Sequence, residues 1–275
     1  MKPLRVPDAY NYISAFLTFA CQFDCHYCIN KYGSLNNYHG MPAADWIRGL
    51  NRIETVEDRP ITLTGGEPTL YKGLYDVLDG IDPMITVDLL TNGAFDVEEF
   101  MRKIPPGRMK RDAKYASIRI SYHPGYTDKN KLEHVASTLH KNGYSVGIWA
   151  IDTGVSLDDL FDDFDWLGVD IRKKEYLDGD HGTYKYPAAV EGKRKSCMCK
   201  PSELLIAPDG RLFRCHADLY RGINSYGHIL DEEVALPTYF LPCDEFGFCN
   251  PCDIKAKFNR FQQTGHCSVT IKGIT

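Results

Sequence analysis

Three cysteines near the N-terminus form the pattern with the clearest chemistry in this sequence. Cys21, Cys25 and Cys28 stand in the run Cys-Gln-Phe-Asp-Cys-His-Tyr-Cys, a C-x3-C-x2-C spacing. Thiolates are the usual ligands of iron–sulfur clusters, and three of them leave one iron of a [4Fe–4S] cluster open. Closed metal sites are structural and open ones catalytic. The spacing therefore predicts a catalytic cluster; a structural zinc site with a separate fourth ligand is the alternative.

A second group of chemically useful residues is the run Gly65-Gly66-Glu67-Pro68, which follows a predicted strand. Paired glycines let a ligand approach the backbone closely. The glutamate can accept hydrogen bonds from an ammonium group, and the proline stiffens the loop. Taken alone, the same four residues also fit a plain β-turn.

The elements that must position these residues alternate between strands and helices. Short apolar runs predict strands at 13–19, 61–64, 85–90, 117–122, 145–151 and 169–172. Apolar positions at three- and four-residue steps predict helices at 43–53, 131–141 and 155–164. This alternation is typical of an α/β fold with parallel β/α units. The cysteine-rich, glycine-rich and polar features each follow a strand, which in such folds is the functional edge.

Composition and charge limit the classes of function that this protein can have. The chain has 275 residues, 43% of them hydrophobic and 25% charged, as in an ordinary soluble globular protein. A net charge of −5 gives no support for a nucleic-acid partner. The apolar stretch 13–20 is too short to span a bilayer. Cysteines at metal-ligand spacings, without a secretory signal, predict a reducing, cytoplasmic location with no membrane attachment.

The cysteine loop after the first strand, with Gly-Gly-Glu-Pro after the second, resembles the radical S-adenosylmethionine (SAM) superfamily. The resemblance implies a partial (β/α)6 TIM-like barrel in residues 1–185. It implies that the three cysteines hold a [4Fe–4S] cluster at which SAM is reductively cleaved to a 5′-deoxyadenosyl radical. A low-potential electron donor of the flavodoxin or ferredoxin type would be a partner.

The same resemblance implies a set of residues that contact SAM. Gly65, Gly66 and Glu67 would hold its amino group, and Tyr27 would lie near the adenine. The remaining contacts, to the ribose or carboxylate, would come from Thr91, Asn92 and Ser121. For Ser121, a hydrogen-bonded hydroxyl at the sheet edge is the plainer alternative.

A second group of cysteines lies in the C-terminal part, residues 186–275, which we predict to be a small separate domain. Cys199-x10-Gly210-x4-Cys215 encloses a predicted β-hairpin with an Asp-Gly turn, and Cys249-x2-Cys252 follows. This arrangement resembles the SPASM/twitch extensions of radical SAM enzymes. In its shorter, twitch form it implies an auxiliary [4Fe–4S] cluster held by these four cysteines.

Two alternatives to this ligand set stay open. The same four cysteines also fit a zinc ribbon. The downstream order Cys243-x5-Cys249-x2-Cys252 departs from the full SPASM pattern, so that Cys243 could replace one of the four. With Cys199, Cys215, Cys249 and Cys252 as the ligands, three cysteines remain without a role: Cys197, Cys243 and Cys267. Burial is the commonest fate of a free cysteine.

These features predict an oxidoreductase-type radical SAM enzyme that abstracts a hydrogen atom from a small-molecule or peptide substrate, with net oxidation or modification assisted by the auxiliary cluster. The alternatives are a peptide epimerase or crosslinking enzyme, a glycyl-radical activase, and a non-enzymatic iron–sulfur or zinc-stabilised binding module. The short segment before the first strand leads us to expect no fused leader-peptide domain. Polar residues predicted near strand ends are Tyr122, His123, Asp152 and Arg172; none is assigned as a catalytic base.

Overall fold

An eight-stranded sheet, parallel except for its last pair, organises the fold. The computed structural model describes residues 1–28, 30, 38–55, 59–109, 115–154, 156–175, 195–246, 257–259, 262–266 and 269–272. The strand order is β11-β10-β2-β4-β5-β6-β7-β8, and only the β10–β11 pair is antiparallel. The strands are β2 (Tyr12–Thr18), β4 (Ile61–Gly65), β5 (Val87–Thr91), β6 (Ile118–Tyr122), β7 (Val146–Asp152), β8 (Asp170–Glu175), β10 (Glu203–Ile206) and β11 (Leu212–Phe213).

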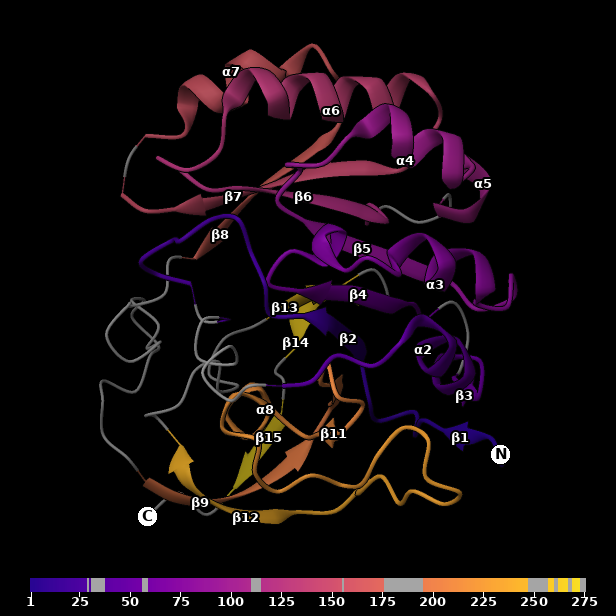
Figure 1. Ribbon diagram of the computed structural model, residues 1–275. Coiled ribbons are helices and arrows are strands. Elements are labelled where there is room, and N and C mark those ends of the chain that lie inside the picture. The colour runs from indigo at the N-terminus through magenta and orange to yellow at the C-terminus, as the bar shows by residue number, and fades with distance from the viewer. Residues whose placement is uncertain are drawn as a thin grey trace.

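Helices connect the parallel strands in the expected alternation (Figure 1). They are α2 (Ala43–Leu50), the short 3-10 turn η1 (Pro68–Leu70), α3 (Leu74–Gly80), α4 (Val97–Lys103), α5 (Pro106–Met109), α6 (Lys129–Lys141) and α7 (Asp158–Asp165). In Figure 1, α6 and α7 lie along the side of the sheet formed by β6 and β7. Six parallel strands in the order 2-4-5-6-7-8 fit the predicted α/β class; closure into a partial barrel stays a prediction.

The two faces of this sheet differ in chemistry because side chains alternate along each strand. One face, here called the helix face, buries aliphatic residues such as Leu63, Leu89, Ile120 and Ile148 against the helices. The opposite face, here called the polar face, carries Thr62, Asp88, Arg119 and Arg172. The larger apolar cluster thus lies between the sheet and the helices, and a smaller one that includes Phe16 and Phe213 lies on the opposite face at β2, β10 and β11.

The predicted helix 43–53 ends earlier than its periodicity indicates. Helix α2 stops at Leu50, and Ile53 instead starts strand β3 (Ile53–Glu54), which pairs in parallel with β1 (Leu4–Arg5). The Asn51 side chain explains the stop, because it donates to Gly80 O at 2.9 Å and accepts from Asp82 N at 2.8 Å. Asparagine favours such bonds over helix continuation.

The predicted C-terminal hairpin is confirmed, and it joins the main sheet. Leu205 and Ile206 pair with Phe213 and Leu212, and Gly210 takes a φ of 82° in the turn. Strand β10 then pairs in parallel with β2, which extends the sheet beyond its N-terminal strand. The predicted boundary near residue 185 lies outside the described residues and stays a prediction.

The rest of the C-terminal part forms smaller elements (orange to yellow in Figure 1). A three-stranded sheet has the order β12-β9-β15, and a two-stranded one pairs β13 with β14. The elements are β9 (Lys195–Pro201), α8 (His216–Arg221), β12 (Leu241–Phe246), β13 (Lys257–Asn259), β14 (Gln262–His266) and β15 (Val269–Lys272).

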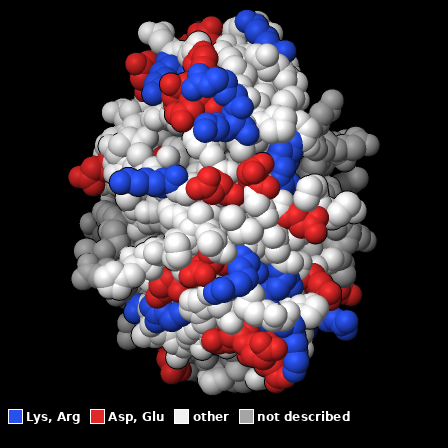
Figure 2. All heavy atoms as spheres, turned by 45° about the vertical axis from the view of Figure 1, so that its right-hand side comes forward, with Lys and Arg blue, Asp and Glu red and all other residues white. Residues whose placement is uncertain are grey.

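Charge on the outer surface is mixed. Figure 2 shows Lys and Arg beside Asp and Glu on the face that it presents, with neither sign gathered into one broad patch. In the part of the chain that the structure describes, no helix has the length and apolar character needed to cross a membrane.

Candidate functional site

The cysteine loop follows β2 at the carboxyl edge of the sheet. Cys21 is exposed, Cys25 is buried and Cys28 is half-buried. The loop turns back on itself, since Cys28 N donates to Cys25 O at 2.9 Å. Burial, together with the neighbouring Cys28 and Cys21 thiols, raises the pKa of the Cys25 thiol to about 12. The three thiols therefore lie near enough to one another for their charges to interact.

The two glycines hold the start of this loop against the sheet. A Cβ on Gly65 would lie 2.0 Å from Thr18 O, and one on Gly66 would lie 2.4 Å from Ala20 O. Gly66 N donates to Thr18 O and Glu67 N to Ala20 O, each at 2.8 Å. Close backbone approach is thus the reason for both glycines, and the segment that approaches them is the one leading into Cys21.

Glu67 ties the Gly-Gly-Glu-Pro loop to the end of β5. Its carboxylate is fully buried and accepts from Thr69 N (3.1 Å), Thr69 Oγ1 (2.6 Å), Thr91 Oγ1 (2.7 Å) and Asn92 N (2.6 Å). Burial raises the pKa of Glu67, and these four hydrogen bonds oppose that rise. The carboxylate therefore fixes the loop, and contacts from 65–67 to an amino group would come from backbone carbonyls.

Asn92 connects the end of β5 to the cysteine loop. Its Nδ2 lies 3.7 Å from Cys21 Sγ, and its Oδ1 accepts from Gln22 Nε2 at 3.2 Å and Ala94 N at 2.9 Å. Gln22 was not predicted as a site residue, although its position between two cysteines is a usable signal. The structure thus brings Thr91, Asn92 and Glu67 together beside Cys21.

An aromatic group anchors the other end of the loop to the segment after β6. Tyr27 is buried, stacks on His123 with ring centroids 5.9 Å apart, and its Oη lies 3.1 Å from His123 Nδ1. Tyr126 Oη accepts from His26 N at 3.2 Å. No local sequence pattern marks Tyr126 as a site residue, because only the fold places it against the cysteine loop.

His123 gives this anchor a pH dependence. Burial, with a smaller contribution from the charge on Lys174, lowers the pKa of His123 from 6.5 to about 4. Between pH 6.5 and 4, His123 is therefore protonated in the unfolded chain but not in the folded chain. The free energy of unfolding falls as the pH drops through that range. We expect the unfolding free energy of the His123→Asn protein to fall by roughly 3 kcal/mol less than that of the wild type over this pH range.

The measurement is urea unfolding of both proteins at pH 7, 5.5 and 4. Carboxylates contribute equally to both, so only the difference between the two proteins counts. Equal slopes of unfolding free energy against pH would show that His123 is not held neutral by the fold.

The other predicted contacts are placed differently. Ser121 lies on β6 and is nearly buried, but in the described residues it makes none of the contacts that join Asn92 to the cysteine loop. Tyr122 packs against the apolar core of the helix face. Asp152 is exposed at the end of β7 and accepts from Gly154 N at 3.2 Å, as a turn cap does.

The described cysteines of the second group gather around Arg214. Cys199 and Cys243 are hydrogen-bonded to each other, which, with burial, raises the pKa of Cys199; Cys215 lies near enough to add to it. Arg214 Nη1 lies 3.5 Å from Cys199 Sγ, and its Nε donates to Asp218 Oδ2 at 2.7 Å. Arg214 directly precedes Cys215 in the sequence, a signal that cysteine spacing alone does not capture.

The remaining cysteines divide between β9 and the undescribed part of the chain. Cys197 is buried on β9, opposite Cys243 on β12. Three further cysteines, Cys249, Cys252 and Cys267, lie outside the described residues.

Helix α8 connects the two cysteine groups. Cys215 caps its N-terminus, where the sulfur accepts from Asp218 N at 3.5 Å. From the same helix, Tyr220 Oη donates to Asn30 Oδ1 at 2.8 Å, and Asn30 Nδ2 donates to Gly65 O. Helix α8 thus links Cys215 to Asn30, two residues after Cys28.

Both cysteine groups fit a thiolate-bound group in donor chemistry. Within the described ranges, however, no three His, Cys, Asp or Glu side chains are set closely enough to hold a metal ion. Binding a cluster would therefore have to draw the thiols of either group together. The buried partners of the thiols, Asn92 in one group and Arg214 in the other, are the supports such a group needs.

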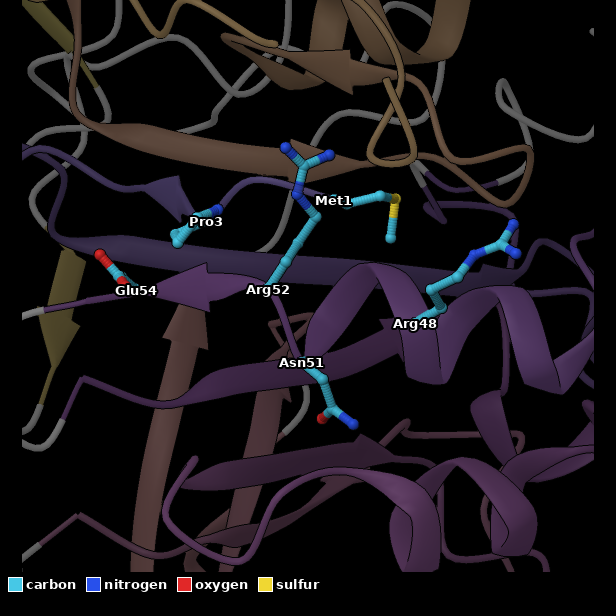
Figure 3. A pocket seen from close by; sticks show the side chains of 6 residues that line it. All are labelled: Met1, Pro3, Arg48, Asn51, Arg52 and Glu54. Atoms are coloured by element: carbon cyan, nitrogen blue, oxygen red, sulfur yellow. The ribbon is translucent and has the colours of Figure 1, made fainter. Parts of the chain in front are cut away.

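A surface hollow lies near the N-terminus, away from the cysteine loop. It measures about 380 Å3 and is bordered by the N-terminal residues, α2 and β3 (Figure 3). Arg52 there donates to Lys2 O and Ile229 O, both at 2.8 Å, so its charge holds backbone carbonyls together. A second hollow of about 310 Å3 lies against the end of β2, bordered by Phe19, Tyr38 and Tyr71.

Comparison with known proteins agrees with this site. Residues 16–111 match the model of the Radical SAM superfamily, and they include both the cysteine loop and the Gly-Gly-Glu-Pro loop. The chain is 32% identical to 7-carboxy-7-deazaguanine synthase of Clostridium acetobutylicum over 143 residues, 46% of this chain and 61% of that one. It is 25% identical to GTP 3',8-cyclase of Clostridium perfringens (strain SM101) over 141 residues, 50% of this chain and 42% of that one.

These similarities support a radical SAM domain in the part of this chain that contains both loops. The named relatives are a synthase and a cyclase, and the chain is an enzyme. The chain spans less than two thirds of the length of either relative. A solved structure titled BtrN in an open conformation aligns with 80% of this chain and 75% of its own at a TM-score of 0.42 and 16% identity, a likeness too low to bear on function.

Proposed function

We propose that this enzyme reductively cleaves SAM at a [4Fe–4S] cluster held by Cys21, Cys25 and Cys28, and uses the resulting 5′-deoxyadenosyl radical to abstract a hydrogen atom from its substrate. The observation that carries the proposal is the set of contacts that fastens the cysteine loop to the two loops after β4 and β5. Gly66 and Glu67 hold the residues before Cys21, and Asn92 lies against its sulfur.

Each part of the site has a role that its contacts support. When bound, the cluster would supply the electron that cleaves SAM. The backbone around Gly65 and Gly66 would position the amino acid end of SAM, because it lies next to the cysteine loop. Thr91 and Asn92 would hold the Gly-Gly-Glu-Pro loop in place through their hydrogen bonds to the Glu67 carboxylate. Tyr27, which is buried, would limit access of water to Cys25.

The C-terminal cysteines are proposed to hold an auxiliary [4Fe–4S] cluster. Its ligands would be Cys199 and Cys215 with Cys249 and Cys252. The contact between Cys199 and Cys243 supports Cys243 as the replacement for one of the last two. Arg214, buried beside these thiols, would stabilise them as thiolates. An auxiliary cluster linked through α8 to the first site suits net oxidation of the substrate.

The relatives support a small molecule as substrate over a peptide. Their names refer to a deazaguanine and to GTP, both small heterocyclic compounds. The similarity covers half of this chain or less, so the specific reaction is not carried over. A flavodoxin- or ferredoxin-type protein is the proposed electron donor.

The proposal is tested by anaerobic reconstitution with iron and sulfide, followed by SAM and dithionite. We expect roughly four iron atoms per chain for one cluster and eight for two. We also expect release of 5′-deoxyadenosine, measured by liquid chromatography with mass spectrometry. About one zinc per chain, no iron and no 5′-deoxyadenosine would contradict the proposal and favour a zinc-stabilised module.

A further inference from the structure

The polar face of the sheet has two layers of charge that differ in how they are satisfied. In the first layer, Arg119 is paired with Asp88 through a 2.6 Å hydrogen bond and donates to Thr62 Oγ1 at 3.3 Å. Both charged side chains are almost completely buried. This layer is neutral as a pair and belongs to the interior of the protein.

The second layer lies on β8 and is more basic. Arg172 and Lys174 are two residues apart, so both lie on the polar face, roughly 7 Å from one another along the strand. The Arg172 guanidinium lies over two rings that contact each other edge to face, 5.0 Å from the centroid of Tyr115 and 5.5 Å from that of Trp149. Its Nε donates to Asp170 at 2.6 Å. The stacking fixes the guanidinium in orientation, as planar recognition of an anion requires.

Lys174 places positive charge beside the cysteine loop. It is partly exposed, pairs in register with Ile151, and its charge reaches His123. His123 in turn stacks on Tyr27, two residues from Cys25. The charge on Lys174 thus acts on a side chain that itself contacts the cysteine loop.

We propose that Arg172 and Lys174 bind the carboxylate or phosphate of a small anionic substrate, and so position it for the chemistry proposed above. The inference rests on that proposed function and deepens it by naming the substrate class. Two cations on one strand face, one of them held in orientation, can both donate charge-assisted hydrogen bonds to an oxyanion. A chain with a net charge of −5 has no general attraction for anions, so this site is local.

The test measures binding of two probe anions, succinate and glycerol 3-phosphate, to the reconstituted enzyme with SAM, using saturation-transfer NMR. Glycerol is the uncharged control. We expect saturable binding of one or both anions, and Lys174→Gln is expected to weaken it by roughly 10- to 100-fold, as loss of a charged hydrogen bond does. Lys174→Arg is expected to retain binding because it keeps the charge.

Lys173→Gln is the matched control, since it removes the same charge from the next residue of the same strand. Lys173 lies on the helix face, 5.9 Å from the ring centroid of Phe161, and its removal is expected to change the affinity by less than about twofold. Thermal unfolding of each variant shows whether it folds. Preference for succinate would identify a carboxylate substrate, and preference for glycerol 3-phosphate a phosphorylated one.

Three results would overturn the inference: no saturable binding of either anion, equal weakening by Lys173→Gln and Lys174→Gln, or tighter binding of an acidic peptide than of both small anions. Release of 5′-deoxyadenosine is measured in parallel. Anion binding that depends on Lys174 without any 5′-deoxyadenosine would contradict the radical chemistry alone. Release of 5′-deoxyadenosine without anion binding would contradict this inference alone.

Discussion

Replacing Cys25 with serine is expected to abolish both the [4Fe–4S] cluster and the release of 5′-deoxyadenosine. Cys25 is the buried member of the triplet, and its thiol interacts with the other two. A hydroxyl is a poor ligand for iron in place of a thiolate. The loss should exceed the roughly 10- to 100-fold that removal of a ligand's outer hydrogen-bond partner costs. The measurements are iron content, the electron paramagnetic resonance signal of the reduced protein, and 5′-deoxyadenosine.

Two further variants calibrate this result. Asn92→Ala removes the side chain that lies 3.7 Å from Cys21 Sγ, and we expect an intermediate loss of roughly 10- to 100-fold. Cys267→Ser removes a cysteine to which no role is assigned, and should leave 5′-deoxyadenosine release unchanged. A Cys25→Ser protein with wild-type iron content and 5′-deoxyadenosine release would show that the triplet does not hold the catalytic cluster.

The sequence predicted the fold well wherever a strand is followed by a chemically distinctive loop. All six predicted strands are present, because their apolar residues alternate with residues that pack elsewhere. Helices α3 and α4 were not predicted. Both are only seven residues long, too short to show a clear apolar period. The pairing of β10 with β2 joins residues about 190 positions apart, which local pattern cannot reveal.

Most residues of the candidate site were predicted, but the hydrogen bonds and ring contacts between them were not. The resemblance placed Glu67 against the amino group of SAM, a contact that stays a prediction. The structure shows that its carboxylate already accepts four hydrogen bonds from the protein. Such a role depends on burial, and burial depends on tertiary packing. For the same reason His123 was predicted only as a polar residue at a strand end. In the structure it stacks on Tyr27 and so supports the cysteine loop.

Loss of the buried cation at the centre of the polar face is expected to destabilise the whole protein. Arg119 and Asp88 are 4% and 3% exposed, and their hydrogen bond is 2.6 Å long. Arg119→Met would leave the Asp88 carboxylate buried without its partner, which costs about 3–5 kcal/mol. For a chain of this size the melting temperature should fall by roughly 10 °C. Differential scanning calorimetry and urea unfolding measure the two quantities.

The exposed pair of Arg5 and Glu54 provides the matched control. Arg5→Met also breaks an arginine–carboxylate contact, of 3.0 Å, but at side chains 86% and 52% exposed. Solvent screens such a pair, so the expected loss is below about 1 kcal/mol. If Arg119→Met costs as little as Arg5→Met, the buried pair does not contribute to stability.

A double variant separates the charge from the packing. Arg119→Met with Asp88→Leu removes both charges, and replacing a buried pair with apolar residues of similar volume is often neutral. We therefore expect the double variant to regain most of the stability lost in Arg119→Met. If it does not, the destabilisation comes from the packing of the guanidinium on the Tyr115 ring, 4.9 Å away, rather than from the unpaired carboxylate.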